Sequence, residues 1–264
     1  MRPANGDASA RPGRRFHRLF RADGRTVIVA LDHGLTGLTK LGALARPAEI
    51  LAAAAASGGD AVLVTPGIAR AFPHLLGRVG VIVRLDGGVV TYYGEDTQEM
   101  RQLASVEDAL RWGADGVALM GMIGTPEEAS SLQRMAEVAA DCDRWGMPLL
   151  AEMLPGGYGA DVSVDEVATA TRVACELGAD IVKVPYCGSP EEYRRVITES
   201  YRPVVVLGGG RGPDVAERLR GALKAGASGV AVGRDIWLSA DPAATTRELV
   251  ELVHEEGGSA RAGS

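Results

Sequence analysis

The chain has 264 residues, 46% of them hydrophobic, so it is long enough and apolar enough for one large α/β domain. Its net charge of −6 argues against a nucleic acid partner, and no run of about eighteen apolar residues predicts a membrane span. The three cysteines, Cys142, Cys175 and Cys187, show no metal-ligand spacing and cannot all pair as disulfides, which favours a cytoplasmic location.

The two ends of the chain predict little folded structure. Residues 1–13 are polar and Arg-rich without an apolar core region, so we expect a disordered leader and not a secretory signal. Residues 14–21 (RRFHRLFR) predict a short helix that covers the floor of a barrel. The folded domain is expected over 14–256, with a disordered tail over 257–264.

Eight short, Val-rich runs without polar alternation predict strands buried on both faces, as in a parallel sheet. They span 26–31, 61–65, 79–85, 116–120, 148–153, 181–184, 203–207 and 229–232. Four of these runs follow a glycine-containing segment that can end a helix: 57–60, 112–115, 177–180 and 225–228.

Helix starts recur between the predicted strands. A capping-box pattern occurs at 105–108, 125–128, 163–166 and 189–192. Four prolines stand where a first helical residue should fall: Pro126, Pro190, Pro213 and Pro242. Eight strands alternating with helices predict a single (β/α)8 TIM barrel, with an open doubly wound sheet as the alternative.

Lysine is rare in this chain. The 28 lysines and arginines include only three lysines, Lys40, Lys183 and Lys224. Lys183 lies in an apolar strand, at the end where barrel enzymes carry their catalytic residues. Because desolvation disfavours a charged amine, we expect a nucleophile that forms Schiff bases. The alternative is a structural lysine paired with Asp32 or Glu152.

Two carboxylates and a histidine fall at the same end of the predicted barrel. Asp32 and His33 follow the first strand, and Glu152 lies near the end of the fifth. A carboxylate beside an iminium can move protons at a substrate hydroxyl. The alternative for either carboxylate is a structural role, as Asp32 would have in capping the next turn.

Glycines gather after the seventh and eighth strands, where barrels commonly bind a phosphate. Backbone N–H groups approach phosphate oxygens closely at glycine, and arginine adds a charged fork. We therefore predict a phosphate site made of Gly208, Gly209, Gly210, Gly233 and Arg234. The histidines His17, His33, His74 and His254 lie on different elements without metal-ligand spacing, so we expect neither a metal nor a cofactor.

Four segments resemble the archaeal-type class I fructose-bisphosphate aldolase family, which includes 2-amino-3,7-dideoxy-heptulosonate synthases and a thiolase of autoinducer-2 breakdown. They are VIVALDHG (27–34), IVKVPY (181–186), VVVLGGG (204–210) and GVAVGRDIW (229–237). The resemblance extends from about residue 14 to residue 254. It implies an iminium between Lys183 and a ketone donor, dihydroxyacetone phosphate, with Asp32 and His33 at the reacting centre. It also implies a donor phosphate near Arg234 and a homo-oligomeric assembly.

The chain departs from that family at two places. Family aldolases carry Tyr-Pro-Arg-Gly at the end of strand five, whereas this chain has Leu154 in the first position and Gly156 in the third. Tyr158 is the candidate replacement for the proton-transferring tyrosine, its alternative being an exposed loop aromatic. A second family histidine after Asp-His-Gly is also missing, with Gly37 in that region.

These departures predict an aldolase whose acceptor aldehyde carries no phosphate. The donor would be a small phosphorylated keto compound, and the acceptor aldehyde stays unidentified. The alternatives are a fructose-1,6-bisphosphate aldolase, a lysine-dependent thiolase or acyltransferase of the same family, and a phosphate-binding barrel without lysine chemistry.

Overall fold

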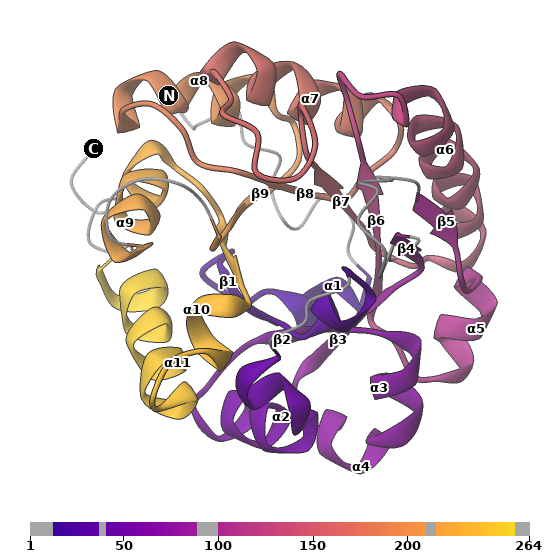
Figure 1. The fold of residues 1–264 in the computed structure, drawn as a ribbon, viewed down its shortest axis with the longest axis vertical. Helices are drawn as coiled ribbons and strands as arrows, with labels where there is room; N and C mark the ends of the chain where they lie inside the picture. The colour runs from indigo at the N-terminus through magenta and orange to yellow at the C-terminus, as the bar shows by residue number, and fades with distance from the viewer. Residues whose placement is uncertain (1–12, 37–40, 89–99, 210–214, 257–264) are drawn as a thin grey trace.

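A computed structural model describes residues 13–36, 41–88, 100–209 and 215–256. Eight parallel strands close into a barrel in the order β1-β10-β9-β8-β7-β6-β3-β2 (Figure 1). Their bounds are β1 Thr26–Ala30, β2 Ala61–Val64, β3 Gly80–Arg84, β6 Gly116–Gly121, β7 Leu149–Met153, β8 Ile181–Val184, β9 Val204–Leu207 and β10 Gly229–Val232. The predicted barrel and its eight strands are therefore confirmed.

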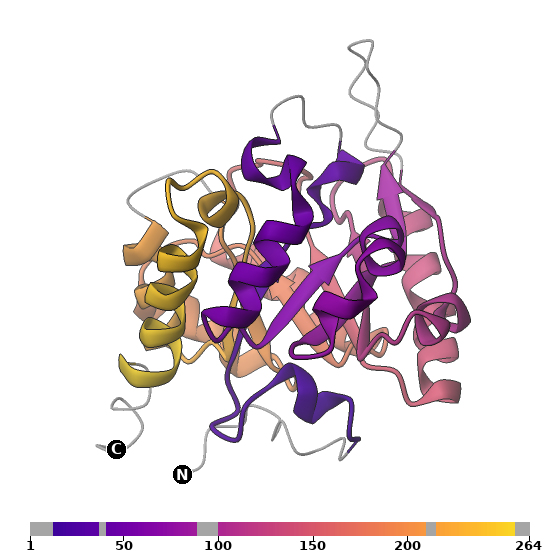
Figure 2. The ribbon, with the colours of Figure 1, turned by 90° about the horizontal axis from the view of Figure 1, so that it is seen from below.

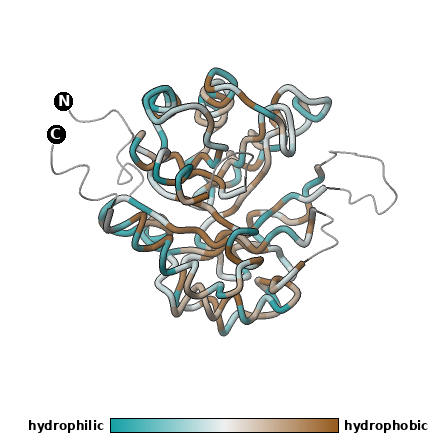
Figure 3. Tube along the Cα trace, turned by 60° about the vertical axis from the view of Figure 1, so that its left-hand side comes forward, coloured by the Kyte–Doolittle hydropathy of each residue, from teal (hydrophilic) through white to brown (hydrophobic). Residues whose placement is uncertain are grey.

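Helices surround the strand ring and cover the outer face of the strands (Figure 1), and many residues in the interior of the molecule are hydrophobic (Figure 3). The helices are α2 Pro47–Ala56, α3 Pro66–Ala71, α4 Pro73–Leu76, α5 Val106–Arg111, α6 Glu128–Trp145, α7 Val164–Glu176, α8 Pro190–Glu199, α9 Val215–Ala225, α10 Arg234–Trp237 and α11 Pro242–Glu251. Two 3-10 turns, η2 (Asp32–Thr36) and η3 (Gly42–Ala45), follow the first strand. Within the described residues, no helix combines the length and the apolar character that a membrane span requires.

Three of the four predicted capping boxes are confirmed, at Ser105, Ser163 and Ser189, whose side chains each accept from the N–H three residues later. The prediction at Thr125 is wrong, because its hydroxyl donates to the Met122 carbonyl at 2.7 Å and belongs to a turn before α6. Of the prolines, Pro190 and Pro242 open their helices as predicted. Pro126 lies two residues before α6, so that prediction is wrong, and Pro213 lies outside the described residues.

The predicted helix-ending segments each contain a glycine with positive φ: Gly58, Gly113, Gly178 and Gly226. The predicted floor helix is also confirmed as α1 (Phe16–Leu19), which lies across one end of the barrel (Figure 2). Leu19 is fully buried and packs with Ile28, Ile82 and other inward-facing strand residues. Because α1 closes this end, the opposite end is the one left for a substrate. The predicted leader, except for residue 13, and the predicted tail lie outside the described residues.

A pair of short strands was not predicted. The antiparallel pair β4 (Asp86–Gly88) and β5 (Met100–Gln102) stands above β3. Three-residue strands leave too short a pattern to distinguish them from a loop. The hairpin brings Met100 into the apolar layer at the mouth of the barrel.

A histidine near the end of the described chain joins elements at the barrel floor. His254 lies in the π-helical turn η4 (Leu252–Glu256). Its Nδ1 is 2.6 Å from Asp23 Oδ2, and its Nε2 is 2.9 Å from Asp60 Oδ2. Asp60 also pairs with Arg21 at 2.5 Å. Burial alone would lower the pKa of His254, but the hydrogen bonds to Asp60 and Asp23 outweigh burial and raise that pKa.

We expect His254→Gln to lower the free energy of unfolding by about 1–3 kcal/mol at about pH 5.5, because it removes two charge-assisted hydrogen bonds. Since the folded pKa is raised, this contribution is complete below the unfolded value of 6.5 and is lost as pH rises through the folded value. Urea unfolding from about pH 5.5 to about pH 8.5 measures it. His74→Gln, at an exposed position, is the control. An effect of constant size over that range would contradict the prediction.

Candidate active site

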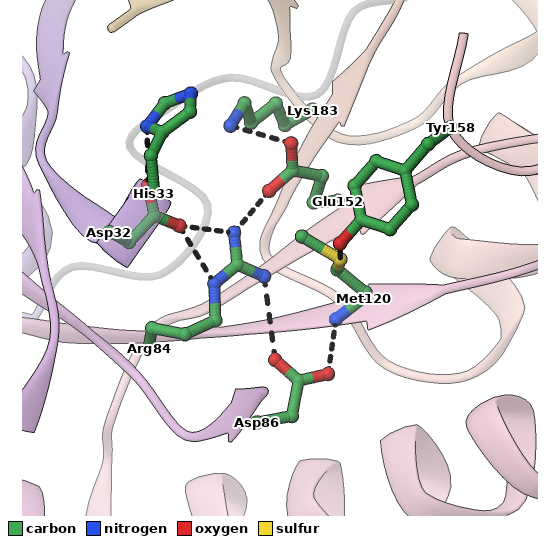
Figure 4. Close-up of polar contacts among 8 residues, drawn as sticks. All are labelled: Asp32, His33, Arg84, Asp86, Met120, Glu152, Tyr158 and Lys183. Carbon is green, nitrogen blue, oxygen red and sulfur yellow. Dashed lines mark hydrogen bonds and ion pairs between the residues drawn. The ribbon is translucent and has the colours of Figure 1, made fainter. Parts of the chain in front are cut away.

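Four charged side chains meet inside the open end of the barrel (Figure 4). Asp32 follows β1, Arg84 ends β3, Glu152 lies in β7 and Lys183 lies in β8. All four are buried, Arg84 being 2% and Lys183 4% exposed. Parallel strands end together, so residues far apart in the chain converge there. The structure therefore brings together three residues that the sequence predicted and one that it did not.

Lys183 contacts an acid directly. Its Nζ lies 2.7 Å from Oε1 of Glu152, and the two residues are paired in the β7–β8 register. Side chains alternate along a strand, so Val182 and Val184 pack against the surrounding helices while Lys183 faces the barrel interior. Of the two acids considered from sequence, Glu152 is the one that pairs with the lysine.

Arg84 is the charged residue that sequence analysis missed. Its Nε and Nη2 donate to Oδ2 of Asp32 at 2.9 and 2.8 Å, and Nη2 also contacts Oε2 of Glu152. Nη1 lies 3.5 Å from Oδ1 of Asp86. The signal was present in the sequence, because an arginine inside an apolar strand is as unusual as the lysine at position 183.

The surrounding charges set the protonation of the acids. Burial would raise the pKa of Glu152, but the cations of Lys183 and Arg84 outweigh it and lower that pKa to about 2. Glu152 is therefore a carboxylate at neutral pH. For Asp86 the balance is reversed: burial raises its pKa, and Arg84 offsets only part of this effect.

His33 lies beside Asp32, its Nδ1 3.5 Å from Oδ1 of that carboxylate. Its ring meets the ring of Trp237 edge-on, with 5.4 Å between centroids. Burial lowers the pKa of His33, and the nearby charge of Asp32 opposes this only in part, so the imidazole is neutral at pH 7. Gly233 packs directly against the ring, where an added Cβ would collide with it. The glycine thus lets His33 approach β10.

The predicted phosphate residues fall on two neighbouring strand ends. Gly208 and Gly209 follow β9, and Arg234 opens α10 after β10. The guanidinium of Arg234 lies against Gly209, where a Cβ would collide with it. Arg218 donates to the Gly208 carbonyl at 3.0 Å. Gly210 lies outside the described residues. Because β9 neighbours β8, Gly208 and Gly209 lie next to the strand of Lys183.

Tyr158 lies on the loop after β7, 46% exposed, with its hydroxyl end turned toward the charged cluster (Figure 4). The hydroxyl donates to Sδ of Met120 at 2.8 Å. Desolvation of the hydroxyl raises the pKa of Tyr158, with Arg84 opposing it and Glu152 adding to it. The phenol is therefore protonated and able to donate.

Next to Tyr158 the barrel mouth is apolar. Met100, Met120, Met122 and Leu154 form one buried cluster, against which Leu207 packs. Leu154 stands in the first position of the family's Tyr-Pro-Arg-Gly stretch and has no hydroxyl. In the described ranges, no three His, Cys, Asp or Glu side chains gather as a metal site would require.

Comparison with known proteins gives one family. The model of the DeoC/LacD family aldolases matches residues 26–239. A Halobacterium salinarum 2-amino-3,7-dideoxy-D-threo-hept-6-ulosonate synthase is 38% identical over 251 residues, with 91% of this chain and 92% of that protein covered. A Streptomyces griseus 2-amino-4,5-dihydroxy-6-oxo-7-(phosphonooxy)heptanoate synthase is 37% identical, with 94% of this chain and 93% of that protein covered.

Solved structures agree with this result. A Schiff-base-forming fructose-1,6-bisphosphate aldolase superposes with a TM-score of 0.81 at 32% identity, covering 91% of this chain and 98% of that chain. An archaeal fructose-1,6-bisphosphate aldolase, with its catalytic lysine covalently bound to the carbinolamine intermediate, has a TM-score of 0.80 at 31% identity. It covers 90% of this chain and 98% of that one.

Proposed function

The chain belongs to the DeoC/LacD family of aldolases and is a class I aldolase, and we propose that Lys183 forms its Schiff base with a dihydroxyacetone-phosphate-type donor. The observation that carries this proposal is the buried amine of Lys183, 2.7 Å from a Glu152 carboxylate at the open end of the barrel. An amine in that place can reach a substrate carbonyl and pass its proton to an adjacent base.

The acceptor in this proposal is an aldehyde without phosphate. A 2-amino-4,5-dihydroxy-6-oxo-7-(phosphonooxy)heptanoate divides at its 4,5 bond into dihydroxyacetone phosphate and a four-carbon amino-acid aldehyde. Among the described residues, the apolar layer of Met100, Met120, Met122 and Leu154 supports a similar acceptor, because these four side chains carry no charge for a second phosphate. We therefore propose a biosynthetic direction, in which the enzyme joins the two compounds.

The proposed steps use this chain's own side chains. Glu152 takes one proton from Lys183, and the free amine adds to the donor ketone. Glu152 then returns that proton to the carbinolamine hydroxyl, which leaves as water and gives the iminium. Asp32 removes a proton from the adjacent donor carbon, which gives the enamine that attacks the aldehyde carbon. Tyr158 protonates the new alkoxide, hydrolysis of the iminium releases the product, and the proton held by Asp32 returns to Tyr158. The neutral His33 orients Asp32.

Borohydride reduction with dihydroxyacetone phosphate, followed by peptide mass mapping, tests the proposal. The expected result is a reduced donor adduct on the peptide that contains Lys183. An unmodified Lys183 peptide would overturn the proposal. Aldehyde screening then identifies the acceptor. Cleavage of fructose 1,6-bisphosphate at rates typical of metabolic enzymes would favour the bisphosphate aldolase alternative, and dependence on coenzyme A would favour the thiolase alternative.

The donor phosphate is assigned to Gly208, Gly209, Gly210, Gly233 and Arg234. We expect Arg234→Gln to raise KM for dihydroxyacetone phosphate about 10- to 100-fold, the worth of one charge-assisted hydrogen bond, with little change in kcat. Steady-state kinetics measure this, with unphosphorylated dihydroxyacetone as the matched substrate whose KM should not change. Arg247→Gln, an exposed change on α11, is the control variant. Equal effects on both substrates would remove Arg234 from the phosphate site.

The cellular location and the oligomeric state of the enzyme are also part of the proposal. Free cysteines at positions 142, 175 and 187 support a reducing, cytoplasmic location. We also propose a homo-oligomer, which light scattering after size-exclusion chromatography tests.

A further inference from the structure

The cluster around Lys183 contains a charged residue to which the proposed steps assign no role. We propose that Arg84 is the positioning residue of the reaction, holding Asp32 and Glu152 so that one oxygen of each faces the substrate. This inference rests on the proposed function, because it concerns how Lys183 and its two acids are arranged. Arg84 itself touches no reacting atom.

In each carboxylate, one oxygen binds Arg84 and the other oxygen faces a different residue. Arg84 binds Oδ2 of Asp32 and Oε2 of Glu152, while the other oxygens, Oδ1 and Oε1, face His33 and Lys183 (Figure 4). A carboxylate that is held through one oxygen by a rigid donor has less freedom to rotate. The oxygens available for proton transfer are therefore in place before a substrate arrives.

The guanidinium is suited to this work because it presents several N–H groups in a rigid plane. Nε and Nη2 donate to Asp32, Nη2 also donates to Glu152, and Nη1 faces Asp86. A lysine at the same position would bring a point charge that cannot hold two acids at fixed angles. Geometry thus distinguishes Arg84 from a simple counter-ion.

The far side of the guanidinium is anchored to the backbone. Oδ1 of Asp86 faces Arg84, and Oδ2 accepts the Met120 N–H of β6 at 2.8 Å. Asp86 is fully buried. Because strand β6 lies between β3 and β7, this bond links Arg84 to the strand that separates its own strand from that of Glu152. The guanidinium of Arg84 therefore has little freedom to move.

Arg84 also affects the protonation of the acids around it. Three carboxylates, Asp32, Asp86 and Glu152, face two cations, Arg84 and Lys183. Loss of Arg84 leaves the three acids with Lys183 beside Glu152 and with Arg134, whose charge acts on Asp86, so the repulsion among the acids favours protonation of one of them. A protonated Glu152 could no longer take the proton from Lys183. Arg84 therefore keeps the acids in the form that the reaction needs, as the lowered pKa of Glu152 indicates.

Two substitutions separate geometry from charge. We expect Arg84→Lys to lower kcat by about 100-fold or more through misplacement of the acids, with KM for the donor changed less than about threefold. We expect Arg84→Met to lower kcat further and to move the acidic limb of kcat/KM upward by about one pH unit or more. Arg84→Lys, which keeps a cation, should leave that limb near its original position.

Arg25→Lys is the control. Arg25 is also a buried arginine, but it lies at the opposite end of the barrel and donates to the Val253 carbonyl.

The outcomes are distinguishable. Borohydride labelling of Lys183 in the unsubstituted enzyme tests the proposed function alone, and its absence overturns that function whatever Arg84 does. With labelling present, slower labelling and a low kcat in folded Arg84→Lys support the positioning role. A kcat within about threefold of the unsubstituted enzyme overturns it. Loss of the folded circular dichroism spectrum in both variants also overturns it, because Arg84 would then act through stability.

Discussion

Replacing Lys183 with arginine is expected to lower turnover by at least about 10⁴-fold, because a guanidinium stays protonated and cannot form an iminium. Arginine retains a cation beside Glu152, so the ion pair that Lys183 makes at 2.7 Å has a partner in the variant. The substitution thus removes the nucleophile and leaves the charge. Steady-state assays and borohydride labelling measure the loss.

The same pair of experiments separates the catalytic role of Lys183 from a structural one. A purely structural lysine would tolerate arginine, so a Lys183→Arg enzyme with near-normal turnover would contradict the Schiff-base assignment. Lys183→Met should be as inactive and also less stable, since it leaves Glu152 with Arg84 alone. Lys224→Met is the control, because Lys224 is exposed on α9 and pairs with the exposed Glu191.

Neutralising Glu152 is expected to have the second-largest effect. Glu152→Gln keeps the shape of the side chain, but it removes the base beside Lys183, and kcat should fall by about 10²- to 10³-fold. The amide cannot accept the ammonium proton, so borohydride labelling of Lys183 should slow as well. Rapid-quench labelling measures the step directly. A kcat within about threefold of the unsubstituted enzyme would exclude Glu152 as the base.

Stability provides a check on the same residue. The pKa of Glu152 is lowered from 4.5 to about 2, so its contribution is present above about pH 4.5 and is lost as pH falls toward 2. Glu152→Gln should remove this acid-side dependence from urea unfolding curves. Asp115→Asn is the matched control: Asp115 pairs with Arg18 at 2.8 Å at the barrel floor, so its loss should lower stability without lowering kcat.

Local patterns were sufficient for most of the fold. Strand β8 begins at Ile181 and ends at Val184, as its apolar run predicts, because strand burial and a preceding helix-ending glycine are short-range features. The capping boxes at Ser163 and Ser189 are equally local. The prediction at Thr125 is wrong because a threonine hydroxyl can form either a helix cap or a turn. Here it donates to the Met122 carbonyl and belongs to a turn.

For the site, the sequence by itself determined three of the four charged residues, and only the tertiary structure added Arg84 and decided how the four pair. Lys183 stood out as a rare lysine in an apolar strand, and Asp32 and Glu152 as acids at strand ends. That Lys183 pairs with Glu152, and that Arg84 joins acids 52 and 68 residues away, follows only from closure of the barrel. Ion pairs depend on spatial distances of a few ångströms. Closure of the barrel sets these distances between residues that are far apart in the chain, and no local sequence pattern contains them.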